Sequence, residues 1–71
     1  MRSQLKRARV SAGYTQEELA GFLGLSQQTI SKYEKAVTTP SHFKIIRDCE
    51  RLLGVRAEQL FPDVFDEKTF V

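Results

Sequence analysis

The stretch Thr15–Glu34, TQEELAGFLGLSQQTISKYE, predicts two short amphipathic helices joined by a tight turn at Gly24. Thr15 followed three residues later by Glu18 is the pattern of a capping box, in which the two residues satisfy each other's backbone N–H groups. Ser26 is a good N-cap for the second helix. Because this second helix carries polar side chains away from its apolar residues, we expect its polar face to contact another molecule.

The residues on either side of this stretch predict three further helices. One runs from Ser3 to Ala12, one from about His42 to Leu53 with Ser41 as its cap and Gly54 as its stop, and a last turn lies within 56–61. We therefore expect an all-α domain of five short helices over residues 1–61, followed by a tail, 62–71, without a clear period. The apolar side chains expected in the core are Leu5, Ala8, Tyr14, Leu19, Ala20, Phe22, Leu23, Leu25, Ile30, Tyr33, Phe43, Ile45, Ile46, Cys49, Leu52, Leu53, Val55, Leu60 and Phe61.

Composition limits the class of protein. A chain of 71 residues with 41% apolar and 28% charged residues has the size and balance of one small soluble domain. No apolar run is long enough to cross a bilayer, and no apolar segment of a secretory signal follows the basic N-terminus. The single cysteine, Cys49, cannot form an intramolecular disulfide or a metal cluster, which favours a reducing cytoplasm.

Charge is distributed unevenly along the chain. The net charge is +2, but residues 1–35 hold six basic and three acidic side chains, and the charged residues after Pro62 are three acids, Asp63, Asp66 and Glu67, against Lys68 alone. A basic front half suits a polyanionic partner on one face of the molecule. Taken alone, this signal is weak.

The chain resembles the helix-turn-helix domain of the phage repressor and Cro family in two linked strings. These are Arg9–x3–Gly13–x–Thr15–Gln16–x2–Leu19–Ala20 and Gly24–Leu25–Ser26–Gln27–x–Thr29–Ile30–Ser31–x2–Glu34, followed by Pro40–Ser41 and Leu53–Gly54–Val55. The resemblance covers roughly Leu5 to Phe61. It implies a five-helix, lambda-repressor-like DNA-binding domain in which the second and third helices form the helix-turn-helix.

The resemblance also implies which residues read the DNA sequence. In this fold the second helix of the motif enters the major groove with its N-terminal residues first. A glutamine amide carries both a donor and an acceptor, so it can bridge N6 and N7 of an adenine. The residues implied to read bases are Gln27, Gln28, Thr29 and Lys32.

Other residues are implied to contact phosphates or to hold the motif in place. The phosphate contacts are expected at the start of the motif and in the loop after it, from Thr15, Gln16, Lys35, Thr38 and Thr39, with Arg2 and Lys6 as further candidates. Arg9 and Glu34 are implied to form a partly buried ion pair that positions the motif.

The sequence departs from the family pattern at several positions. Ala36 stands where glycine is usual, so a positive φ there would cost about 1 kcal/mol. Glu50 stands where alanine is frequent, and Arg56 replaces the usual cap of the last helix. The region around Pro40 lacks the basic residues that some relatives carry, which predicts modest affinity per monomer.

The predicted function is a sequence-specific, double-stranded DNA-binding transcriptional regulator, a repressor of phage or bacterial type and not an enzyme. No cofactor or metal is expected. We expect a homodimer on a palindromic operator, because one such domain touches few bases. The residues expected at the dimer surface are Val55, Leu60 and Phe61, with Val64, Phe65, Phe70 and Val71 of the tail.

Two alternatives remain open. One is an antitoxin or a restriction-modification control protein, which would use the same domain on its own operon. The other is a helical protein-interaction adaptor that has kept the fold without binding DNA.

Overall fold

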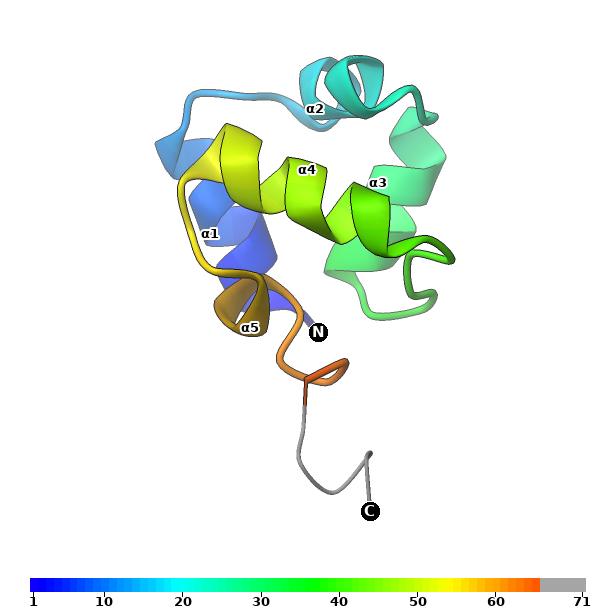
Figure 1. Cartoon of the computed structure of the whole chain (residues 1–71). Coiled ribbons are helices and arrows are strands. Elements are labelled where there is room, and N and C mark those ends of the chain that lie inside the picture. Colours follow the sequence, from blue (N-terminus) through cyan, green and yellow to red (C-terminus); the bar gives the residue numbers. More distant parts are fainter. Residues whose placement is uncertain (66–71) are drawn as a thin grey trace.

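The computed structural model describes residues 1–65, and within that range the chain forms five helices and no strands (Figure 1). They are α1 (Ser3–Ser11), α2 (Gln16–Leu23), α3 (Gln27–Glu34), α4 (Phe43–Leu53) and α5 (Ala57–Leu60). The all-α, five-helix fold predicted from the sequence is confirmed.

The helices pack around one apolar core to which all five contribute. α2 packs on α3 and α4, whereas α5 packs on α1 and α4, so α4 crosses the middle of the molecule in Figure 1. The N-terminal part of the chain and α5 lie close together. The buried apolar side chains are Leu5, Ala8, Leu19, Ala20, Leu23, Ile30, Tyr33, Ile46, Cys49, Leu53, Ala57, Leu60 and Phe61.

The predicted signals at the ends of α2 and α3 are confirmed. Thr15 Oγ1 accepts a hydrogen bond from the Glu18 N–H (3.0 Å), and Glu18 Oε1 accepts one from the Thr15 N–H (2.9 Å). Gly24 ends α2 with a φ of +70°, a backbone conformation that a side chain would disfavour. Ser26 then caps α3 by accepting a hydrogen bond from the Thr29 N–H.

Two phenylalanines expected in the core lie at the surface instead. Phe22 is 63% exposed and Phe43 is 57% exposed. Each contacts another aromatic ring edge-on at the surface: Phe22 contacts Tyr14, and Phe43 contacts Phe65. The prediction failed for Phe22 because the eight-residue α2 buries only a narrow stripe, which Leu19, Ala20 and Leu23 already fill. Phe43 is the first residue of α4, whose buried side chains begin at Ile46.

The start of α4 also differs from the prediction. The N-cap position is His42, not Ser41, and in the described part of the chain no side chain caps this end by a hydrogen bond. The C-terminal end agrees with expectation, because Gly54 adopts a φ of +66° and stops the helix.

The last helix is capped from a distance. Arg56 occupies the N-cap position of α5 without capping it through its side chain. Instead, Glu50 of α4 accepts a hydrogen bond from the Ala57 N–H through Oε2, at 2.8 Å. The two departures from the family pattern therefore compensate each other, since the carboxylate of Glu50 supplies the acceptor that position 56 lacks.

The C-terminal segment packs on the domain as far as the structure describes it. Leu60 and Phe61 are fully buried in the core, so they cannot form a dimer surface as predicted. Val64 and Phe65 are half-buried against the same core. Phe70 and Val71, the other residues assigned to a dimer surface, lie outside the described residues.

Candidate nucleic-acid interface

The candidate reading surface is the exposed side of α3. Ile30, Tyr33 and Glu34 of this helix are buried, and they attach it to the rest of the domain. On the opposite side Gln27, Gln28 and Lys32 are exposed. The helix begins at Gln27, so the two glutamines lie in its first turn, at the end that enters a groove first in this motif.

Thr29 is placed differently from the glutamines. It is half-buried, and its Oγ1 lies 2.9 Å from Ser26 Oγ, while its N–H donates to the same Ser26 oxygen. The hydroxyl of Thr29 is therefore part of the cap of α3. Its methyl group remains as an apolar contact, which suits the C5-methyl of thymine.

The start of α2 carries the two residues expected to meet phosphate. Thr15 is exposed but uses its hydroxyl oxygen as the cap acceptor described above. Gln16 is half-buried, and its Nε2 donates to Glu34 Oε1 at 3.0 Å. An amide nitrogen carries two hydrogens, so one donor of Gln16 is used by the protein and the other remains.

Arg9 and Glu34 form the ion pair that the resemblance implied. Arg9 Nε donates to Glu34 Oε2 at 2.6 Å, and Arg9 Nη1 donates to the Tyr14 carbonyl at 2.8 Å. Arg9 is 8% exposed and Glu34 only 3%. Together with the Gln16 bond, this network joins α1, the start of α2 and the end of α3, and so fixes the angle between the motif and the domain.

The loop after α3 is held in a defined conformation. The Val37 N–H donates to the Lys32 carbonyl (2.9 Å) and the Ala36 N–H donates to the Tyr33 carbonyl (3.1 Å), the two bonds of a Schellman motif. Ala36 adopts the positive φ, +60°, that such a motif requires. The candidate phosphate contacts Lys35, Thr38 and Thr39 are all exposed in or beside this loop.

The structure corrects the assignment of Arg2 as a phosphate contact. Arg2 is 3% exposed, and its guanidinium lies 5.1 Å from the centroid of the Phe61 ring. All five of its N–H donors are accounted for within the protein. Nε donates to Asp63, Nη1 to the carbonyls of Tyr33 and Thr38, and Nη2 to Asp63 and to Thr39 Oγ1.

Sequence reasoning missed this cluster because its members are far apart in the chain. Arg2 and Asp63 are separated by 61 positions, and neither has a local pattern that marks a partner. The hydrogen bond from Arg2 holds the pKa of Asp63 below its usual value. The carboxylate is therefore ionised at neutral pH and balances the buried guanidinium.

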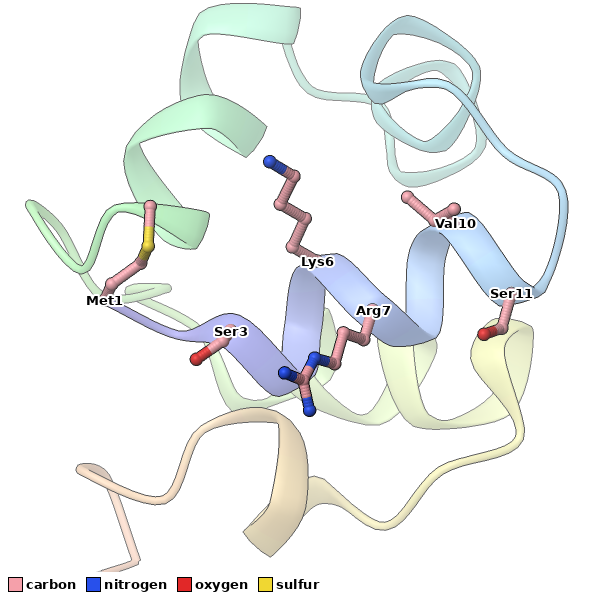
Figure 2. A pocket seen from close by; sticks show the side chains of 6 residues that line it. All are labelled: Met1, Ser3, Lys6, Arg7, Val10 and Ser11. Atoms are coloured by element: carbon pink, nitrogen blue, oxygen red, sulfur yellow. The ribbon is translucent and has the colours of Figure 1, made fainter.

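Lys6, the other residue suggested to reach phosphate, lies on the exposed face of α1. Figure 2 shows it extending from the same side of α1 as Val10, where both line a shallow depression together with Met1. Lys6 is therefore available to an anion, in contrast to Arg2. Within residues 1–65, no group of acidic, histidine or cysteine side chains is arranged to bind a metal, and no helix is long and apolar enough to cross a membrane.

Comparison with known proteins agrees with this geometry. A helix-turn-helix family model matches residues 5–60. The chain is 35% identical to an uncharacterized HTH-type transcriptional regulator of Archaeoglobus fulgidus over 68 residues, 96% of this chain and 93% of the relative. It is 39% identical to another from Methanocaldococcus jannaschii over 61 residues, covering 86% of this chain and 91% of the relative.

A third relative is the SPbeta prophage-derived uncharacterized HTH-type transcriptional regulator YonR of Bacillus subtilis, 37% identical over 57 residues and 80% of this chain. The chain spans about half the length of that protein, 52%. No solved structure gave a significant match. The family model alone covers most of the chain, so the protein is a member of the Cro/C1-type helix-turn-helix family of DNA-binding transcriptional regulators.

Proposed function

We propose that the protein is a sequence-specific repressor that binds a palindromic operator as a homodimer. The observation that carries this proposal is the position of Gln27 and Gln28. Both are exposed in the first turn of α3, and the opposite side of this helix is buried against the core. Their amides can bridge an adenine in the major groove. One relative is a prophage-derived HTH-type transcriptional regulator, which supports a regulator of phage type.

Thr29 and Lys32 extend the reading surface, and the phosphate contacts lie at its two edges. Gln16 and Thr15 meet one strand at the start of α2, where free N–H groups favour an anion. Lys35, Thr38 and Thr39 meet the backbone beyond the end of α3. Arg9 and Glu34 position the motif without reading sequence.

The homodimer follows from the small footprint of one domain. A recognition helix of eight residues contacts few base pairs, and a two-fold symmetric pair reads two half-sites about one helical turn apart. Leu60 and Phe61 are buried, whereas Val55, Val64 and Phe65 of the predicted dimer surface are half-buried. Phe65 contacts the exposed Phe43 edge-on, and we propose this aromatic pair as the apolar patch used for pairing. Sedimentation of Phe43→Ser tests this, because a mass equal to that of the wild-type protein would remove this patch from the dimer.

The test of sequence reading is Gln28→Ala, with operator DNA first selected from a random duplex pool. We expect the variant to lose about 1–3 kcal/mol of discrimination at one base pair while its affinity for random duplex stays almost unchanged. Gln4→Ala is the matched control, because Gln4 is an exposed glutamine on α1. Gln16→Ala should instead weaken binding to operator and random DNA alike.

A salt titration separates DNA binding from a role as a protein-interaction adaptor. Affinity for duplex should fall steeply as salt rises, in proportion to the number of phosphates neutralised. In the separate test of Gln28→Ala, equal losses of affinity on operator and on random DNA would show that Gln28 reads no base. Absent or salt-independent binding by the wild-type protein would refute the proposed function as a whole.

A further inference from the structure

We propose that Arg2 is a positioning residue for DNA binding, which orients the hydroxyl of Thr39 toward a DNA phosphate while Asp63 holds the guanidinium in place. This inference rests on the proposed function, since it concerns the loop that would meet the DNA backbone beyond α3. It assigns a role to Arg2 and to Asp63, neither of which lies in the helix-turn-helix.

Arg2 organises the loop and the end of α3 together. Its Nη1 donates to the Tyr33 carbonyl (2.8 Å) and to the Thr38 carbonyl (2.7 Å), and its backbone N–H donates to the Glu34 carbonyl (2.8 Å). Three carbonyls that face one residue cannot move independently. Arg2 therefore fixes where the loop leaves the recognition helix.

The same guanidinium sets the direction of the Thr39 hydroxyl. Arg2 Nη2 donates to Thr39 Oγ1 at 2.9 Å, so this oxygen accepts from a cation. The hydroxyl hydrogen must then point away from Arg2, and Thr39 is an exposed residue. A hydroxyl that accepts from a charged donor is polarised into a better donor, which suits a phosphate oxygen.

Asp63 holds the guanidinium of Arg2 in one orientation. It accepts from Arg2 Nε at 2.9 Å and from Nη2 at 2.7 Å, a two-point contact that sets the plane of the guanidinium. Asp63 is itself negative and its side chain is 51% exposed, so by charge alone it would repel DNA. Its positional effect and its electrostatic effect on DNA binding thus have opposite signs, and this makes the inference testable.

The decisive experiment compares Asp63→Asn with Glu58→Gln on random duplex and on selected operator. Both variants remove one negative charge, but Glu58 is an exposed residue of α5 with no part in the Arg2 cluster. We expect Asp63→Asn to bind about three- to tenfold more weakly on both DNAs, the effect of losing one hydrogen bond. Glu58→Gln should bind equally well or slightly more tightly.

A double-mutant cycle tests whether Arg2 acts through Thr39. Thr39→Val removes the hydroxyl while keeping the shape of the side chain, and Arg2→Lys keeps the charge but supplies three donors in place of five. Each single variant should lose affinity, and the loss in the double variant should be clearly smaller than the sum of the two single losses. Circular dichroism at the binding temperature establishes that each variant is folded, because a merely structural role would lower the melting temperature without changing the affinity of folded protein.

The outcomes separate this inference from the proposed function. If the wild-type protein binds DNA with the expected salt dependence but Asp63→Asn binds as tightly as Glu58→Gln, the positioning role is wrong and the proposed function stands. Fully additive losses in the Arg2 and Thr39 cycle also overturn it. If Arg2→Lys does not fold, the Asp63 and Thr39 variants still decide the question. If the wild-type protein does not bind duplex, both proposals fall together.

Discussion

Replacing Ala36 by glycine should stabilise the protein, although it removes a side-chain atom. Ala36 adopts a φ of +60°, held there by the two backbone bonds that close the end of α3. The same pair of bonds closes α2, where Gly24 occupies the corresponding position with a φ of +70°. The end of α1 repeats these bonds at Gly13, with a φ of +84°, so within the described residues the chain adopts one backbone geometry twice with glycine and once with alanine.

The magnitude follows from two opposing contributions. A non-glycine residue in the left-handed region costs about 1–2 kcal/mol, which Ala36→Gly would relieve. Glycine gives the unfolded chain more freedom, which lowers the stability by about 0.4–1 kcal/mol. The net gain should be about 0.5–1 kcal/mol, or about 2–8 °C in melting temperature for a domain of this size.

Urea unfolding and thermal melting of the variant measure this gain directly. Ala12→Gly is the matched control, because Ala12 is also exposed at a helix end but has a φ of −78°. That substitution should lower the free energy of unfolding by about 0.4–1 kcal/mol. If Ala36→Gly destabilises the protein as Ala12→Gly does, the positive φ of Ala36 carries no strain and the reasoning is refuted.

Three further predictions concern the core and the caps. Glu50→Ala should lower the free energy of unfolding by about 0.5–2 kcal/mol, because it leaves the first N–H of α5 without its acceptor. The control is Glu58→Ala, which should cost only about 0.3 kcal/mol. Urea unfolding measures both. Burial raises the pKa of the Cys49 thiol to about 12, so the unfolded thiol ionises first and stability should fall by about 1.4 kcal/mol per pH unit above pH 9. Between pH 8 and 10.5, the free energy of unfolding measured with urea should fall less steeply for Cys49→Ala than for the wild-type protein. If the two proteins lose stability in parallel, the fall does not come from the Cys49 thiol. Arg9→Met should lower the free energy of unfolding by about 3–5 kcal/mol, because it leaves the buried Glu34 carboxylate without its charged partner. Adding Glu34→Leu should recover most of that loss. Urea unfolding measures both variants, and a double variant less stable than Arg9→Met would disprove this.

Local signals were read correctly from the sequence because their partners are three or four residues apart. The capping box of Thr15 and Glu18 and the cap at Ser26 depend only on neighbouring backbone, and each forms as predicted. The ion pair of Arg9 and Glu34 spans 25 positions and came from the family resemblance, not from any local pattern.

Errors arose where tertiary packing decided between residues of similar type. Phe22 has the same apolar character as Leu23, but only Leu23 faces the core, and helical spacing alone did not separate them. Glu50 was read as a departure from the family, and its function as a cap became visible only when α4 and α5 were placed together. The base-reading residues remain predictions, because the structure shows that Gln27 and Gln28 are exposed and not what they touch.

The contact between Arg2 and Asp63 also has a consequence for how the protein matures during synthesis. Its partners are 61 positions apart, whereas α2 and α3 are neighbours in the chain and can associate early. A contact that closes a loop of this length is formed late, because the loss of chain entropy precedes the gain. A ribosome-bound chain would therefore hold an assembled helix-turn-helix before its N-terminal arginine has met its partner. Full affinity for DNA would then be acquired only after residue 63 has left the ribosome and met Arg2, a step later than the assembly of the motif itself.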